Sequence, residues 1–221
     1  MDCLSLIWHG ETIELCADRT ARLPAYGLLL AADIHLGKAA SFRSLGAAVP
    51  EQATLETLER LDQAWKRSGL AKLIILGDLF HSKASLQGPG YDAFLNWAGQ
   101  YSREDLVLIC GNHDRRCGEL PLHTEDEMKA GSLMLRHHPG NGGPTVCGHI
   151  HPGYRLEGKG KQGERCPCFW IQQENLILPA FGEFTGMAAA QPEPEDRIII
   201  TAGKTIREIP LNPKRIITKM C

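Results

Sequence analysis

Short motifs rich in histidine and aspartate recur along the chain at positions where they could bind metal ions. They are Asp33-Ile34-His35, Gly77-Asp78, Gly111-Asn112-His113-Asp114, His137-His138 and Gly148-His149-Ile150-His151. Imidazole, carboxylate and amide groups in combination suit manganese, iron or zinc, whereas magnesium and calcium prefer sites made only of oxygen ligands. The residue types therefore predict a transition-metal site.

The candidate ligands are too numerous for one ion. They are Asp33, His35, Asp78, Asn112, His137, His149 and His151. A single tetrahedral ion uses four ligands, so this set fits two divalent ions, with Asp78 as the natural bridging carboxylate. Two divalent cations outweigh two aspartates and a bridging hydroxide, which leaves a positive site that favours an anionic phosphate ester. Such a pair generates hydroxide at neutral pH and holds a phosphoryl group for in-line displacement.

Each motif follows an apolar run that predicts a buried strand. The runs cover residues 26–32, 73–76, 106–110, 133–136 and 145–147. Because the carboxyl ends of parallel strands meet at one sheet edge, we expect the motifs to converge there. Residues i and i+2 of Asp-x-His and His-x-His point the same way if the backbone stays extended. Glycines before Asp78, Asn112 and His149 allow sharp exits from the strands. Any one motif alone is more typical of an ordinary turn, and only their joint occurrence indicates a site.

The remaining pattern predicts a single α/β domain spanning residues 1–221. A hairpin is expected over 4–8 and 12–15, and helices over 50–66 and 91–98. Their inward stripes would be Leu55, Leu58, Leu61 and Trp65 in the first helix, and Tyr91, Phe94, Leu95 and Ala98 in the second. Alternating strands and helices predict parallel βαβ units in the first half, followed by a mixed extension with strands at 169–171, 176–178 and 198–201. Surface loops are expected at 157–165, the more flexible of the two, and at 191–196.

Composition excludes several broad classes. Hydrophobic residues make up 43% and charged residues 23%, as in ordinary globular proteins. The net charge of 24 − 26 = −2 argues against a protein that coats nucleic acid by bulk charge, so phosphate binding must be local. No apolar run is long enough for a membrane span and no secretory signal is expected. The eight cysteines, Cys166 and Cys168 among them, are expected to be ordinary reduced thiols in the cytoplasm.

Taken together, the motifs over residues 30–152 resemble the calcineurin-like metallophosphoesterase superfamily. The resemblance implies a four-layer αββα sandwich with two central mixed β-sheets. It implies that Asp33, His35 and His151 hold one metal, that Asn112, His137 and His149 hold the other, and that Asp78 holds both. His113 would face the scissile phosphate. His138 stands where an acid is expected, which leaves His138 as the alternative to the favoured ligand His137.

A narrower similarity reaches most of the chain. Residues 36–43, 77–82, 148–153, 167–170 and 178–186 resemble the bacterial DNA ligase-associated phosphoesterases. That group is thought to act with a ligase, a helicase and an exonuclease in DNA repair. The resemblance implies a manganese-dependent phosphodiesterase or endonuclease, with iron or zinc as alternative metals.

Further residues have expected roles near the metals. His113 would protonate the leaving alkoxide or orient the phosphate, and Asp114 would fix the His113 ring or cap a helix. Lys38, Arg43 and Arg115 could bind flanking phosphates or could be solvated charges, and His81 could contact substrate. Two other functions compete with nucleic-acid cleavage. One is a phosphomonoesterase acting on a nucleotide, a phosphoprotein or a small metabolite, and the other is a non-catalytic scaffold with the same fold.

Overall fold

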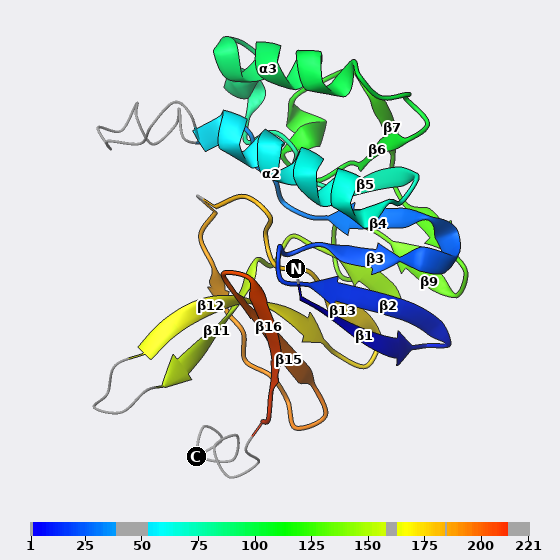
Figure 1. Cartoon of the computed structure of the whole chain (residues 1–221), viewed down its shortest axis with the longest axis vertical. Coiled ribbons are helices and arrows are strands. Elements are labelled where there is room, and N and C mark those ends of the chain that lie inside the picture. The colour runs from blue at the N-terminus through cyan, green and yellow to red at the C-terminus, as the bar shows by residue number, and fades with distance from the viewer. Residues whose placement is uncertain (1, 39–52, 158–162, 184, 212–221) are drawn as a thin grey trace.

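Two mixed β-sheets packed face to face form the body of the molecule, with helices on one outer face (Figure 1). The computed structural model describes residues 2–38, 53–157, 163–183 and 185–211. Helices α2 (Ala53–Ser68) and α3 (Pro89–Ala98) cover the first sheet. Short 3₁₀ turns span Pro24–Tyr26, Lys83–Ser85 and Asp114–Arg116. In the described part of the chain, no helix is both long and apolar enough to cross a membrane.

The first sheet has seven strands in chain order. They are β1 (Cys3–Trp8), β2 (Glu11–Cys16), β3 (Ala21–Leu23), β4 (Leu28–Ala31), β5 (Lys72–Leu76), β6 (Leu106–Ile109) and β7 (His123–Glu125). Strands β1 to β4 pair antiparallel. Strands β4 to β7 pair parallel, with α2 and α3 as the crossovers between β4, β5 and β6. The predicted βαβ units of the first half are therefore confirmed.

The second sheet contains the later strands. They are β8 (Met128–Ala130), β9 (Leu133–Leu135), β10 (Thr145–Cys147), β11 (Pro152–Glu157), β12 (Gly163–Ile171), β13 (Asn175–Ile177), β14 (Ala188–Ala189), β15 (Arg197–Ala202) and β16 (Thr205–Ile209). The main order is β14-β11-β12-β13-β10-β9-β8, and β15 pairs with β12 and β16. Strands β9, β10 and β13 run parallel, while β11, β12, β15 and β16 pair antiparallel.

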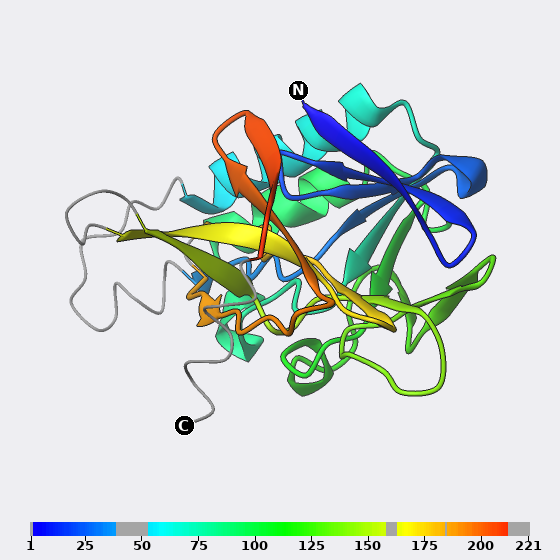
Figure 2. The ribbon, with the colours of Figure 1, turned by 90° about the horizontal axis from the view of Figure 1, so that it is seen from below.

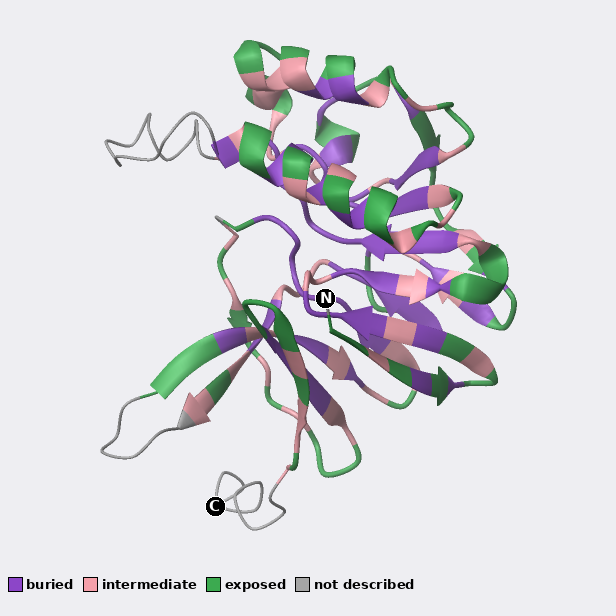
Figure 3. Ribbon diagram, in the orientation of Figure 1, coloured by how far each residue is buried: buried purple, intermediate pink, exposed green. Residues whose placement is uncertain are grey.

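Side chains of the central strands alternate between two cores. Leu28 and Leu30 of β4 face the second sheet, whereas Leu29 and Ala31 face the helices. A parallel strand that is covered on both faces needs apolar residues at every position. This is why these strands are clearly visible in the sequence as unbroken apolar runs. Figure 3 shows the resulting buried band through the middle of the first sheet. The strand ends that carry the motifs are thus anchored on both sides.

The two-sheet α/β architecture agrees with the prediction, but two details differ. The five motif-bearing strands belong to two sheets, since β4, β5 and β6 lie in the first and β9 and β10 in the second. Among the described residues, no helix covers the outer face of the second sheet. A small apolar cluster between β11, β12, β15 and β16 occupies that side instead. The helical fourth layer is therefore not found in this part of the chain.

Local corrections concern helix faces and one loop. Leu55 and Leu95 were expected to face inward but are 44% and 37% exposed, because the buried stripes run through Leu58 and Phe94. Residues 163–165 were expected in a flexible loop but belong to β12, which pairs with β11. The rest of that predicted loop, apart from Glu157 at the end of β11, lies outside the described residues.

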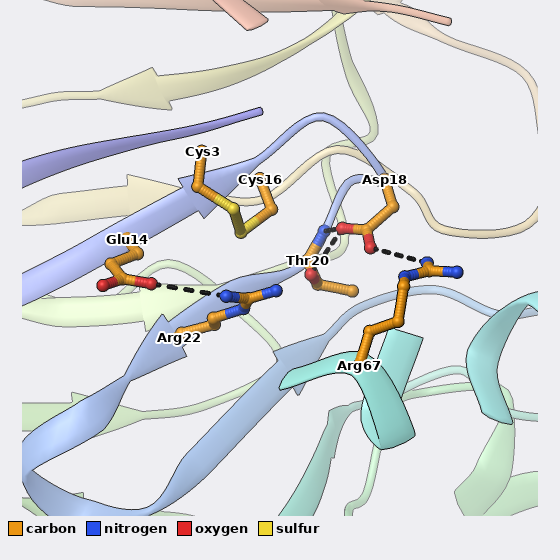
Figure 4. The surroundings of a disulfide bond; sticks show 7 residues. All are labelled: Cys3, Glu14, Cys16, Asp18, Thr20, Arg22 and Arg67. Carbon is orange, nitrogen blue, oxygen red and sulfur yellow. Dashed lines mark hydrogen bonds and ion pairs between the residues drawn. A yellow bond between two sulfur atoms is a disulfide. The ribbon is translucent and has the colours of Figure 1, made fainter. Parts of the chain in front are cut away.

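A disulfide joins the first two strands (Figure 4). Cys3 and Cys16 are direct partners in the β1–β2 ladder, with their Cα atoms 4.1 Å apart. This differs from the expectation of reduced cysteines throughout, which considered spacing along the chain but not the hairpin register that places the two thiols side by side. Cys166 and Cys168 are unbonded, as expected.

Candidate metal centre

The motifs from the two sheets meet at the carboxyl ends of their strands. The segment after β4 runs beside the segment after β5, because the Asp33 N–H donates to the Gly77 carbonyl (3.2 Å) and the His35 N–H donates to the Asp78 carbonyl (2.9 Å). From the second sheet, the His149 N–H donates to the Asp33 carboxylate (2.8 Å). These backbone contacts hold the motif loops of both sheets together.

One group of candidate ligands consists of Asp33, His35 and His151, whose donor atoms all lie within 4.8 Å of one another. His151 Nε2 is 3.3 Å from both Asp33 Oδ1 and His35 Nε2. The other ring nitrogen, His151 Nδ1, lies 3.2 Å from the Gly186 carbonyl. Because a carbonyl only accepts, the proton is on Nδ1 and the lone pair of Nε2 faces the group.

A second group consists of Asn112, His137 and His149. His137 Nε2 lies 3.2 Å from both Asn112 Oδ1 and His149 Nδ1. His137 Nδ1 lies 3.0 Å from the Leu76 carbonyl, so here too the proton is on Nδ1 and the lone pair of Nε2 points into the group. Hydrogen bonds of this kind orient metal-binding imidazoles.

Asp78 lies between the two groups. Its Oδ2 is 3.9 Å from His35 Nε2, and its Oδ1 is 3.5 Å from His137 Nε2. The side chain is only 3% exposed. One carboxylate oxygen therefore faces each group, which is the arrangement that a bridging ligand requires.

The surroundings of these side chains, and not only their sequence motifs, indicate that they bind cations. Asp33 Oδ1 is buried and accepts no hydrogen bond, which is costly for a carboxylate oxygen unless a cation is nearby. Burial, with a smaller contribution from the Lys38 charge, lowers the pKa of His35 to about 2, so this ring is neutral and has a free lone pair. Two pairs of ring nitrogens also lie close together, His35 Nε2 with His151 Nε2 at 3.3 Å and His137 Nε2 with His149 Nδ1 at 3.2 Å. A divalent ion in each group would satisfy all of these atoms.

Each motif glycine provides space for a ligand from another motif. The sequence suggested that these glycines serve sharp backbone turns, but only Gly77 has a positive φ. The stronger reason is close approach, since a side chain at any of the three positions would overlap a ligand. A Cβ on Gly77 would lie 2.1 Å from His137 Nδ1, one on Gly111 2.2 Å from Asp78 Oδ1, and one on Gly148 2.5 Å from Asp33 Oδ2.

Five of the seven candidate ligands have a left-handed backbone. The extended backbone that would have aligned the two side chains of Asp-x-His and of His-x-His is therefore not found. Left-handed φ costs a non-glycine residue on the order of 1–2 kcal/mol, and such strain concentrates at functional sites. The interstrand hydrogen bonds described above hold the loops in this conformation. The positive φ values are 54° at Asp33, 51° at His35, 48° at Asp78, 68° at His149 and 50° at His151.

His113 lies at the edge of the centre, next to Asp78. Its N–H donates to Asp78 Oδ1 (2.9 Å), and its ring Nε2 is 4.0 Å from Asp78 Oδ2. The ring Nδ1 donates to the His81 carbonyl, and the His81 and His113 rings stack with centroids 5.2 Å apart. His81, not Asp114, therefore orients the His113 ring.

Asp114 neither fixes the His113 ring nor caps a helix, which were the two roles expected of it. Its buried carboxylate accepts the N–H groups of Gly111 (3.0 Å) and Phe80 (3.2 Å). No hydrogen bond joins it to the His113 ring among the described residues, and it does not cap the 3₁₀ turn that it begins. It connects the loop after β6 to the loop after β5.

The residues predicted to bind phosphate lie in different surroundings. Lys38 lies close enough for its charge to lower the pKa of His35 and His81, although burial lowers both pKa values more. Arg115 is paired with Asp126 at 2.7 Å, so its charge is already compensated. Arg43 lies outside the described residues. His138 is exposed at the rim, with its ring 4.1 Å from that of His149, whereas His137 is buried within the second group.

The two-sheet fold and this ligand set define the chain as one with the metallophosphoesterase fold. The crystal structure of Pseudomonas putida nuclease MPE is similar over almost the whole chain, with a TM-score of 0.78 and 29% identity, covering 94% of this chain and 100% of the nuclease. YfcE, a phosphoesterase from E. coli, matches at 14% identity and a TM-score of 0.43, covering 84% of this chain and 99% of YfcE. No protein-family model and no curated protein matches the chain.

Proposed function

We propose that this chain is a two-metal phosphodiesterase that cleaves nucleic acid. The observation that carries the proposal is the convergence of seven predicted ligands, from five motifs in two sheets, around the two oxygens of Asp78. The similarity to a nuclease over 94% of the chain supports nucleic acid as the substrate. Net charge contributes nothing to this choice, because it is slightly negative.

The ligand set supports two transition-metal ions. Asp33, His35 and His151 would hold one, Asn112, His137 and His149 the other, and Asp78 both. When bound, such ions activate water at neutral pH and bind phosphoryl oxygens. Four imidazoles, two carboxylates and an amide suit manganese, iron or zinc. We favour manganese on the sequence resemblance.

The protein's own groups would then position the ester and supply a proton. With Nδ1 bonded to the His81 carbonyl, the only free nitrogen of His113 is Nε2, which lies near Asp78 at the edge of the centre. In its protonated form His113 can donate a proton from Nε2 to the departing alkoxide oxygen. The Lys38 ammonium, which is close enough to act on the site histidines, would bind a non-bridging phosphate oxygen.

The test is hydrolysis of bis-p-nitrophenyl phosphate and p-nitrophenyl phosphate, beside labelled single- and double-stranded DNA, with and without Mn²⁺. We expect Mn²⁺-dependent cleavage of the diester and of DNA, abolished by EDTA and by Asp78→Asn. Faster turnover of the monoester, with intact DNA, would instead support a phosphomonoesterase. No bound metal and no hydrolysis of either ester would support the non-catalytic scaffold.

The biological setting is a separate proposal. The resemblance to ligase-associated phosphoesterases supports a role in DNA repair in the cytoplasm, alongside a ligase, a helicase and an exonuclease. Co-purification of tagged protein with those enzymes from its native cells tests this association. Recovery of the chain free of all three would contradict physical association but would leave the hydrolytic proposal intact.

A further inference from the structure

A hairpin that begins at the metal centre carries two exposed arginines on one face. Strands β11 and β12 form this arm, which projects from the body on the side where α2 begins (Figures 1 and 2). Strand β11 starts at Pro152, directly after the candidate ligand His151. Arg155 and Arg165 are direct partners across the two strands, and both are exposed.

The pairing of these arginines is electrostatically unfavourable by itself. Like charges directly opposite each other in a sheet are destabilising. Among the described residues, neither guanidinium forms an ion pair with a carboxylate, whereas other arginines such as Arg136 and Arg197 each do. The only hydrogen bond of either side chain to the described residues is from Arg165 to the Met187 carbonyl (3.0 Å). Most of the five N–H donors on each guanidinium remain available to a ligand.

Two glycines allow the arginine side chains to lie along the arm. A Cβ on Gly153 would be 2.9 Å from Arg165 Cγ, and a Cβ on Gly163 would be 2.6 Å from Arg155 Nε. Each arginine therefore extends across a diagonal glycine of the other strand. Arg165 extends toward the base of the arm and Arg155 toward its tip, so the two charges are spread along the arm.

The base of the arm is connected to the metal centre. The carbonyl of Met187, which binds Arg165, is adjacent in the chain to the Gly186 carbonyl, which accepts from the His151 ring. Arg155 lies four residues beyond His151, or about 13 Å along an extended strand. The positive charges therefore begin next to the centre and continue away from it, as a nucleic-acid backbone would if one of its phosphates occupied the centre.

We infer that Arg155 and Arg165 bind backbone phosphates of a nucleic-acid strand whose scissile phosphate lies at the metal centre. This inference rests on the proposed function and names its substrate as a chain that extends several nucleotides beyond the cleaved bond. Arginine suits this role because its planar fork binds phosphate oxygens in pairs. A small diester that fills only the metal centre would not reach the arm.

Salt dependence of binding measures these contacts directly. Fluorescence anisotropy of a labelled 20-nucleotide single strand gives log K against log salt, with Mn²⁺ present and every variant for this measurement made in a His113→Gln background that slows cleavage. Each phosphate contact contributes about 0.7 to the slope on single strands, so Arg155→Gln/Arg165→Gln should reduce the slope by about 1.4. Between 1 M and 0.1 M salt, the affinity of wild type should therefore rise about 25-fold more than the affinity of the double variant. Arg103→Gln/Arg207→Gln removes two other exposed charges and should leave the slope unchanged.

Hydrolysis separates this inference from the proposed function. Both double variants should cleave bis-p-nitrophenyl phosphate with Mn²⁺ as fast as wild type, and only the Arg155/Arg165 variant should show a raised KM for the 20-nucleotide strand. Arg165→Lys keeps the positive charge and should therefore leave the slope unchanged, which guards against a folding defect. An unchanged slope in the Arg155/Arg165 variant, or an equal loss in the control, overturns the inference. Failure of wild type to hydrolyse the small diester overturns the proposed function instead.

Discussion

Adding one methyl group at Gly111, in the loop after β6, tests whether the Asp78 carboxylate packs against that loop as described. The new Cβ would lie 2.2 Å from Asp78 Oδ1 and 2.5 Å from the Asp78 backbone nitrogen. The shorter of these is about 1.2 Å below the 3.4 Å at which ordinary contact begins. Because a backbone atom is involved as well as the carboxylate, a side-chain rotation alone cannot relieve the overlap.

Gly111→Ala should therefore move the bridging carboxylate by about 1 Å. A misplacement of that size costs about 10²-fold in rate, or about 2.7 kcal/mol of transition-state stabilisation. We expect kcat/KM for bis-p-nitrophenyl phosphate to fall at least this far, and bound metal, measured by elemental analysis, to fall as well. Because one oxygen of the Asp78 carboxylate faces each ligand group, both readouts should change together.

Gly69→Ala is the matched control. Gly69 directly follows α2 and has a left-handed φ of 66°, but a Cβ there would have no atom within 4 Å. This variant should lose about 1 kcal/mol of stability and keep its activity. If Gly111→Ala retained full turnover and metal content, the placement of Asp78 against the Gly111 backbone would be refuted.

Three further predictions follow from individual contacts. His113→Gln should keep bound metal but lower kcat about 10²–10⁴-fold, as expected for loss of a general acid; full turnover would exclude that role. Reducing the Cys3–Cys16 disulfide, which closes a loop with a sequence separation of 13, should lower unfolding stability by at most about 3 kcal/mol, or about 6–12 °C in Tm, without changing activity. Burial raises the pKa of Asp62, but hydrogen bonds from Lys66, Tyr101 and Trp97 outweigh burial and leave that pKa lowered. Asp62→Asn should thus cost about 1–3 kcal/mol at pH 7. Urea titrations should show this difference shrinking as pH falls below about 4, because the unfolded chain then gains the proton before the folded one; a difference that grows as the pH falls would contradict this.

The sequence predicted the central strands well because their burial on both faces leaves an unbroken apolar pattern. Strands β3, β7, β8, β11, β14 and β16 were missed because they are short, polar or exposed on one side. Strand β7, for example, is exposed at all three residues. Local pattern also cannot say which sheet a strand joins, so the division of the motifs between two sheets was visible only in three dimensions.

At the candidate site, residue types and positions after strands were sufficient to select the converging side chains. Their left-handed backbone was not predictable, because interstrand hydrogen bonds impose it against local preference. The partners of Asp114 depend on the neighbouring loop after β5 and leave no signal in the local sequence. The arm arginines do have a signal, since Arg155 and Arg165 flank a stretch of sequence rich in glycine and lysine, but their shared face required the strand register.

The division of the ligands between the sheets has a mechanical consequence. Each half of the sandwich supplies an incomplete coordination shell, so neither half alone can retain an ion firmly. Cations shared across the seam would act as cross-links at one rim of the β-sandwich, and their binding to the native state alone would add RT ln(1 + [M]/Kd) to its stability. Chelation should then loosen that rim first, so that hydrogen exchange accelerates in the loops after β4, β5 and β10 before it does in the strands between them.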